Sequence, residues 1–118
     1  MLRYDKLTVK AQEAQQKAQS VAEQYGQQQL QPLHLLSALV VQLDGVVPPL
    51  LNRLGVRPEA LAQDIDAELA GLPKVSGVTK MFLSDALSEV LEKAFDEAEK
   101  FKDEYVSTEH LLLALAGR

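Results

Sequence analysis

The amino-acid sequence predicts an all-α fold: a compact bundle of about six helices, built from a tandem, pseudo-twofold duplicated helical repeat whose second copy is truncated. Three observations support this prediction. Leu, Ala, Gln, Glu and Lys, which favour helices, dominate the 118 residues, and Ile65 is the only isoleucine. The apolar residues recur at helical spacing and do not alternate with polar ones. The sequence also aligns with itself at an offset of 76 residues.

The first predicted helix follows Thr8, a suitable N-cap, and ends before Gly26, a common C-terminal stop. Its apolar face consists of Ala11, Ala14, Ala18, Val21, Ala22 and Tyr25. Because most of these side chains are small, we expect neighbouring helices to approach this face closely. Nine of the eleven glutamines lie between residues 12 and 31, and we interpret them as the solvated side of the helix.

Three shorter helices are predicted next, and each has a proline at or near its start. The first of them begins near Pro32, whose fixed φ suits the first helical position, and continues through Val40. The other two cover about residues 48–54 and 58–70. A glycine follows each of these two segments, which is typical of a helix C-terminus.

Residues 73–80 (PKVSGVTK) have no helical stripe and contain both Pro and Gly, so we interpret them as a linker. A long helix follows with Ser84 as its N-cap, and its apolar positions keep helical spacing as far as Phe101. After a short loop, a last helix begins at Ser107 and ends near Gly117.

The self-match indicates a duplicated helical unit. Between residues 8–40 and 84–116, ten of the thirty-three aligned pairs are identical, whereas about two would be expected by chance for this composition. We therefore divide a single domain (1–118) into a first repeat (8–72), the linker and a partial second repeat (81–118). The second repeat would need roughly thirty further residues to match the first. We expect the chain to be a piece of a longer protein or a naturally shortened form.

Composition and motifs argue against several classes of function. The chain has no cysteine, which excludes disulfides, zinc–thiolate sites and a thiol nucleophile. Its net charge of −5 and its lack of a basic patch argue against a nucleic-acid partner. No apolar run is long enough for a membrane span and no secretory signal is visible, so we expect a cytoplasmic protein without a membrane partner. No G-x-x-x-x-G-K-[ST] loop is present to hold ATP phosphates, so we expect no enzymatic activity, cofactor or metal in this chain.

Three segments carry a resemblance to a known family. They are QPLHLLSAL at residues 31–39, YVSTEHLL at 105–112 and the connecting LPKVSG at 72–77. In their order and spacing they resemble the N-terminal domain of Clp-type AAA+ chaperones, and the connecting segment is most similar to the disaggregase members. The resemblance covers essentially the whole chain. It implies a module that recruits unfolded or aggregated proteins, or adaptor proteins, to a homohexameric motor that uses ATP and Mg and lies elsewhere in the protein.

The resemblance also implies a contact surface in which polar residues form the rim of an apolar groove. The matching polar positions are Thr8, Asp103 and Glu109. Each has a plainer interpretation: Thr8 is a helix cap, Glu109 is a carboxylate in a first helical turn, and Asp103 is a loop residue. Two carboxylates near a groove could also hold basic groups of a bound chain.

Candidates for the apolar wall of this surface are Phe82, Leu83 and Phe95. Phe82 and Leu83 precede the long helix, and Phe95 lies beside the buried stripe of that helix. All three are also compatible with burial in the core. If they were exposed together, they would form a patch suited to unfolded segments.

Two alternatives to client recruitment remain open. One is an adaptor-docking domain of an unfoldase that serves an ATP-dependent protease, because the same family includes such proteins. The other is an enzyme fragment, which is disfavoured because no serine has evident histidine support. The two histidines, His34 and His110, occupy the same position in the two repeats, which favours a structural role over a metal site.

Overall fold

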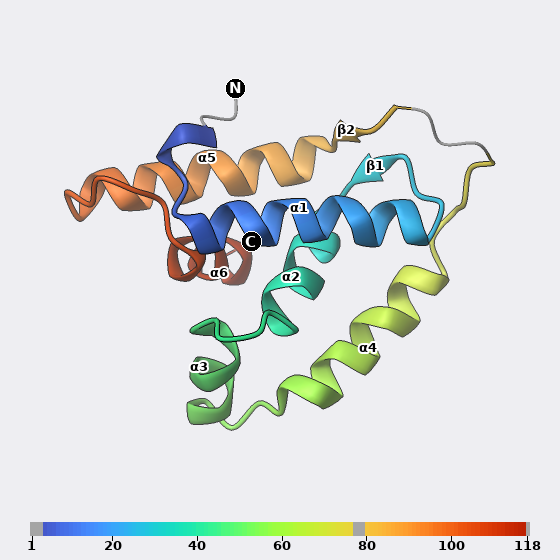
Figure 1. Ribbon diagram of the computed structural model, residues 1–118, viewed down its shortest axis with the longest axis horizontal. Coiled ribbons are helices and arrows are strands. Elements are labelled where there is room, and N and C mark those ends of the chain that lie inside the picture. The colour runs from blue at the N-terminus through green and yellow to red at the C-terminus, as the bar shows by residue number, and fades with distance from the viewer. Residues whose placement is uncertain (1–3, 77–79, 118) are drawn as a thin grey trace.

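Helices form almost all of the regular structure in the computed structural model, which describes residues 4–76 and 80–117 (Figure 1). Within these residues, six α-helices surround one hydrophobic core, which confirms the predicted fold class. In chain order the helices are α1 (Val9–Gln24), α2 (Pro32–Val40), α3 (Val47–Arg53), α4 (Pro58–Ala70), α5 (Asp85–Lys100) and α6 (Thr108–Ala116). The smaller elements are the 3₁₀ turn η1 (Tyr4–Lys6) and the strands β1 (Gln29–Leu30) and β2 (Phe82–Leu83).

The two long helices, α1 and α5, begin in the same way. Thr8 caps α1, because its Oγ1 accepts the backbone N–H of Ala11 at 3.2 Å. Ser84 caps α5, because its Oγ accepts the backbone N–H of Leu87 at 3.0 Å. A cap of this kind stabilises a helix by about 1 kcal/mol. Both caps agree with the helix starts predicted from the sequence.

The core lies between helices that pack in matching pairs. α1 packs chiefly against α2, and small side chains of α1 such as Ala18 and Ala22 are fully buried, as predicted. α5 packs chiefly against α6 and buries Leu87 and Ala94. α4 packs against α2 and buries Leu69. Figure 1 shows that α2, α3 and α4 extend away from α1 on the side opposite to η1.

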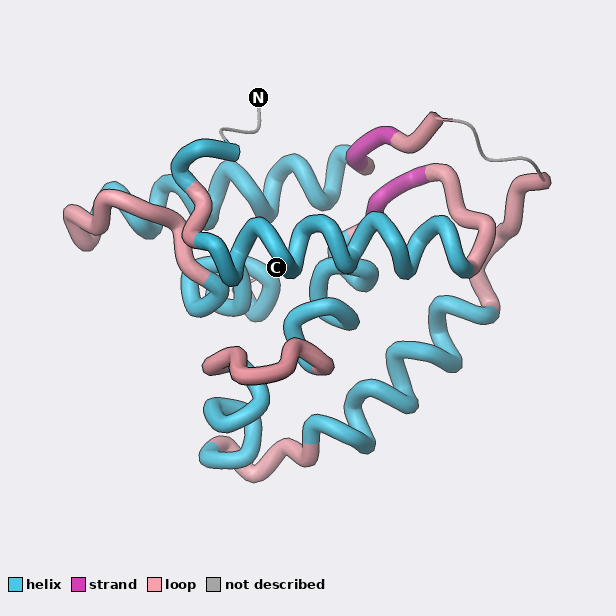
Figure 2. Tube along the Cα trace, viewed as in Figure 1, coloured by secondary structure: helices cyan, strands magenta, loops and turns pink. Residues whose placement is uncertain are grey.

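Two short parallel pairings join the N-terminal and C-terminal halves of the chain, and the sequence analysis did not predict them. β1 and β2 lie side by side, with Leu30 opposite Leu83 (Figure 2). A separate parallel bridge pairs Leu7 with Val106. These two pairings are equivalent, because the 76-residue offset relates Leu7 to Leu83 and Leu30 to Val106. Strands of two residues leave no alternating pattern from which they could be predicted.

The predicted linker lies outside the helices and strands over its described residues, 73–76 and 80. Residues 77–79, which complete that prediction, lie outside the described part of the chain. Val75 is hydrogen-bonded to the turn after α1, because its N–H donates to the carbonyl oxygen of Gly26 at 2.7 Å.

The turns after α1 and α5 share a left-handed conformation but use different residues. Gly26 has a φ of 67° in the first turn, and Lys102 has a φ of 57° in the second. In each turn, the next residue (Gln27 or Asp103) donates its backbone N–H to the last turn of the preceding helix. The two turns therefore deliver Gln27 and Asp103 to equivalent places in the two repeats.

Candidate functional site

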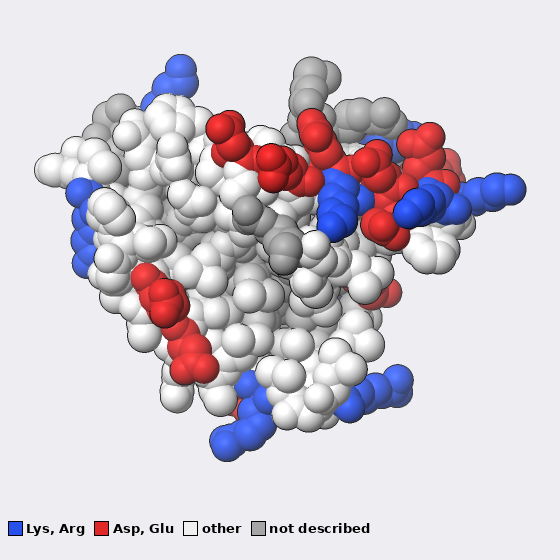
Figure 3. Space-filling model, turned by 180° about the vertical axis from the view of Figure 1, so that it is seen from behind, with Lys and Arg blue, Asp and Glu red and all other residues white. Residues whose placement is uncertain are grey.

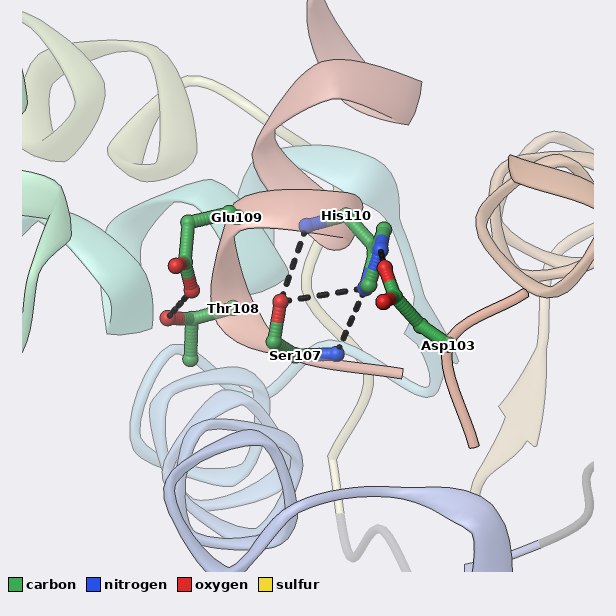
Figure 4. Close-up of polar contacts among 5 residues, drawn as sticks. All are labelled: Asp103, Ser107, Thr108, Glu109 and His110. Atoms are coloured by element: carbon green, nitrogen blue, oxygen red, sulfur yellow. Dashed lines mark hydrogen bonds and ion pairs between the residues drawn. The ribbon is translucent and has the colours of Figure 1, made fainter. Parts of the chain in front are cut away.

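The start of α6 is organised around a buried histidine (Figure 4). Nδ1 of His110 accepts the backbone N–H of Ser107 at 2.9 Å, and the backbone N–H of His110 donates to Oγ of Ser107 at 3.4 Å. These two hydrogen bonds form a capping box. Because Nδ1 accepts a hydrogen bond, the ring proton is on Nε2, which donates to Oδ2 of Asp103 at 2.9 Å. His110 is 8% exposed, whereas the Asp103 side chain is 50% exposed. Asp103 therefore connects the buried cap of α6 to the surface.

The first repeat contains the same arrangement with an amide in place of the carboxylate. Nδ1 of His34 accepts the backbone N–H of Gln31 at 2.8 Å, and its Nε2–H donates to Oε1 of Gln27 at 2.6 Å. The amide nitrogen of Gln27 donates in turn to the carbonyl oxygen of Leu69 at 2.6 Å. Burial lowers the pKa of His34, so its ring is neutral at pH 7. Both histidines have the structural role that their matching positions favoured.

A pocket of about 350 Å³ lies beside Asp103, where α5 ends. We call it the acidic pocket, and it is lined by Lys6, Phe95, Ala98, Glu99, Asp103, Glu104 and Val106. Three of these residues carry carboxylates and one carries an ammonium group, and Phe95 has the largest apolar side chain in the lining. Figure 3 shows that charged side chains gather at this end of the molecule (upper right in that view). The pocket suits a cationic group attached to an apolar stem, such as a lysine or arginine side chain.

The structure brings together two of the predicted site residues, Phe95 and Asp103, in the acidic pocket. Glu109 lies on the other side of the α6 N-terminus, with His110 between it and Asp103 (Figure 4). The carboxylate of Glu109 accepts the hydroxyl of Thr108 at 3.4 Å. Asp103 and Glu109 therefore face different parts of the surface, and only Asp103 lines the pocket.

The other predicted site residues lie apart from the acidic pocket. Thr8 caps α1, and its N–H donates to the carbonyl oxygen of Val106 at 2.9 Å, which links it to the loop before α6. Leu83 is partly buried and packs against the core. Phe82 is 47% exposed and lines a different pocket from Phe95, so the apolar candidates do not form a single patch.

The sequence analysis missed this second pocket, which has a volume of about 280 Å³. We call it the glutamine pocket, and it is lined by Gln27, Gln28, Gln29, Gln31, His34, Leu72, Pro73, Val75 and Phe82. The prediction that the glutamines form a solvated side is wrong for Gln15 and Gln27, which are 6% and 4% exposed. The 76-residue offset could have indicated this pocket, because it aligns Gln27 and Gln28 with Asp103 and Glu104.

The chemistry of the two pockets also bears on the ATP that the resemblance implies for the parent protein. Neither pocket fits ATP. The carboxylates of the acidic pocket would repel phosphates, and none of the described residues that line the glutamine pocket has a cationic side chain. Among residues 4–76 and 80–117, no three His, Asp or Glu side chains are grouped so that they could hold a metal ion. In the same part of the chain, no helix has both the length and the apolar character needed to cross a membrane.

Comparison with known proteins points to one family. The family model described as the Clp repeat (R) N-terminal domain matches residues 6–118. The chain is also similar to Chaperone protein ClpB of Nitratidesulfovibrio vulgaris, with 45% identity over 114 residues. That alignment covers 93% of this chain but only 13% of the relative, so the chain spans a small part of the length of that protein.

Solved structures share the fold. The Hsp104 N-terminal domain from Candida albicans matches with a TM-score of 0.84 and 27% identity, over 92% of this chain and 72% of that one. A ClpV N-domain in complex with a VipB peptide matches with a TM-score of 0.84 and 21% identity, over 98% of this chain and 70% of that one. At 21% identity, the second likeness concerns the fold alone.

Proposed function

Because the chain belongs to the Clp N-terminal domain family and is similar to ClpB over nearly its whole length, we propose that it recruits unfolded or aggregated polypeptides for an ATP-driven disaggregase. The match of residues 6–118 to this family is the observation that carries the proposal. In this proposal the chain binds clients in the cytoplasm and has no ATPase activity of its own. ATP and Mg²⁺ act in a homohexameric motor that these residues do not include.

The acidic pocket supplies a physical basis for client binding. A lysine or arginine of the client would lay its carbon stem on Phe95 and place its charge among the three carboxylates of the pocket, which include Glu99 and Glu104. An exposed ion pair contributes only about 0.2–1 kcal/mol. Binding through a few such pairs is therefore weak and readily reversed, which suits a domain that passes its client on to a motor.

Thr8 and Glu109 extend the proposed contact surface around the start of α6. Thr8 is hydrogen-bonded to the loop before this helix, and Glu109 is an exposed residue of its first turn. A client segment that continued from the acidic pocket around the helix N-terminus would meet a further carboxylate at Glu109. We therefore propose that a client with basic residues spaced along an extended segment binds more tightly than one with a single basic residue.

Titration with a permanently unfolded model protein, followed by NMR chemical shifts, tests this proposal. We expect the largest shifts at Phe95, Asp103 and their neighbours in the acidic pocket. The double variant Glu99→Gln/Glu104→Gln should weaken binding by about three- to tenfold, because two exposed charge interactions are lost. The matched control changes two exposed carboxylates of α4, Asp64→Asn/Glu68→Gln, and should leave binding unchanged. Shifts confined to α4, or equal effects of the two double variants, would contradict the proposal.

Docking of an adaptor protein is a second candidate function. The solved ClpV N-domain holds a VipB peptide, so a domain with this fold can bind a segment of a specific partner. Client recruitment and adaptor docking differ in their dependence on sequence order. Scrambling a bound peptide at constant composition should leave client-type binding within about twofold, whereas it should abolish adaptor-type binding.

A further inference from the structure

We propose that the glutamine pocket is a second binding site, which takes one or two residues of an uncharged, extended peptide segment that carries an apolar side chain. The inference rests on the proposed function, because it adds a second class of client sequence to the same domain. It concerns a different pocket and different residues from the acidic site, so the two can be tested separately.

The two pockets occupy related places in the two repeats. Each contains the residue that accepts the Nε2–H of the helix-capping histidine, which is Gln27 in one pocket and Asp103 in the other. Three lining positions correspond at the 76-residue offset: Gln27 to Asp103, Gln28 to Glu104, and Phe82 to Lys6. At each of these positions the acidic pocket has a charged residue and the glutamine pocket has a neutral one. The duplicated scaffold therefore presents two pockets of different chemistry.

The lining of the glutamine pocket selects against charged ligands. None of its nine lining residues is a carboxylate, an ammonium or a guanidinium group, and His34 is neutral. A charged ligand group placed there would lose hydration without gaining a partner of opposite charge, which is unfavourable. The ligand is therefore uncharged where it occupies the pocket.

The polar groups of the pocket match those of a peptide backbone. A glutamine amide offers both a donor and an acceptor, as a peptide group does. Gln27 is fixed by its hydrogen bonds to His34 and Leu69, so that part of the pocket is preformed. Gln28 is partly exposed and Gln29 is exposed, so their amides are accessible at the rim. An extended segment entering the pocket can pair its backbone with these rim amides.

The apolar side of the pocket provides a place for a client side chain. Phe82 and Val75 are 47% and 45% exposed, and Leu72 and Pro73 lie with them in the lining. Large apolar side chains left exposed around one hollow mark a binding surface. The volume of about 280 Å³ is close to the lower end of the range for ligand pockets, which begins near 300 Å³. The space therefore fits one or two residues and not a folded partner.

Fluorescence anisotropy with two labelled peptides tests the inference. One peptide contains only Phe, Leu, Gln and Ser, and the other replaces two of its Gln residues with Arg; both have blocked ends. Gln28→Glu should weaken the neutral peptide about threefold or more, because it places a carboxylate at the pocket. Phe82→Ala should weaken it about tenfold, because it removes the main apolar contact. Glu104→Gln, the matched control in the acidic pocket, should weaken only the basic peptide.

The inference is overturned if the wild type does not bind the neutral peptide. It is also overturned if neither Gln28→Glu nor Phe82→Ala changes that binding. Both altered residues are partly exposed, so the variants should keep the wild-type circular dichroism spectrum. If the neutral peptide binds and responds to these variants while the basic peptide fails to bind, the inference is supported and the acidic-pocket proposal is contradicted.

Discussion

The substitution Gln27→Ala should destabilise the domain far more than Asp103→Ala, although the two residues have the same place in their repeats. Gln27 accepts from His34 and donates to the carbonyl oxygen of Leu69, and both of these partner residues are fully buried. Alanine would leave one buried donor and one buried acceptor without partners. Asp103 accepts from His110 at a half-exposed position, where water can replace the lost carboxylate.

The expected difference follows from the burial of these groups. Each buried polar group left unpaired costs about 1–3 kcal/mol, so Gln27→Ala should lower the free energy of unfolding by about 3 kcal/mol after partial relaxation. For Asp103→Ala, the loss of one water-accessible hydrogen bond should cost about 1 kcal/mol. The difference of about 2 kcal/mol is a large fraction of the total for a domain of this size, for which 5–15 kcal/mol is typical.

Urea unfolding followed by circular dichroism measures both effects. With a slope of about 1.5 kcal/mol per molar urea, the midpoint of Gln27→Ala should lie about 1.3 M below that of Asp103→Ala. Equal midpoints for the two variants would refute the reasoning, because they would show that the Gln27 bridge contributes no more than its exposed counterpart. A change in slope without a change in midpoint would point instead to an effect on the unfolded chain.

Three further predictions concern pH, backbone conformation and helix caps. Burial lowers the pKa of His34, so the neutral imidazole makes its full contribution to stability above about pH 6.5. This contribution declines as the pH falls below that value towards the lower pKa of the folded state. Urea midpoints measured between about pH 7.5 and pH 5 should therefore fall less in His34→Gln than in the wild type. Lys102→Gly should raise the thermal midpoint by about 2–3 °C, because glycine removes the steric cost of a left-handed φ, about 1 kcal/mol, and this gain exceeds the added entropy of the unfolded chain. Gly26→Ala should lower the thermal midpoint for the opposite reason. Thr8→Ala and Ser84→Ala should each cost about 1 kcal/mol in urea unfolding, and a loss below about 0.3 kcal/mol in both would show that the caps do not stabilise the helices.

The helices could be predicted because their signals are local. Thr8, Ser84 and Ser107 each accept a hydrogen bond from an N–H three residues ahead, so the sequence near each cap contains both partners. The strand pairing of Leu30 with Leu83 and the bridge from Gln27 to Leu69 join residues far apart in the chain. No window of sequence contains both partners of these contacts, and only the fold reveals them.

The candidate site was predictable in part for a related reason. Phe95 and Asp103 meet because the chain turns back after α5, so two residues close in sequence share a pocket. Glu109 does not join them, and helix geometry explains why. Successive residues of a helix are separated by about 100° around its axis, so Glu109 cannot face the same way as His110, which contacts Asp103. Given the contact between Asp103 and His110, the periodicity of α6 places the two carboxylates on different sides of the helix start.

The two parallel pairings that join the two halves of the chain determine how the domain comes apart. Leu7, near the start of the chain, pairs with Val106 near its end, and β1 of the first repeat pairs with β2 of the second. Each half of the chain therefore completes the backbone hydrogen bonding of the other, as subunits do when they exchange strands. Neither half of the chain can unfold without breaking both backbone pairings, so unfolding should be a single cooperative transition. The two halves of the chain therefore form one folding unit.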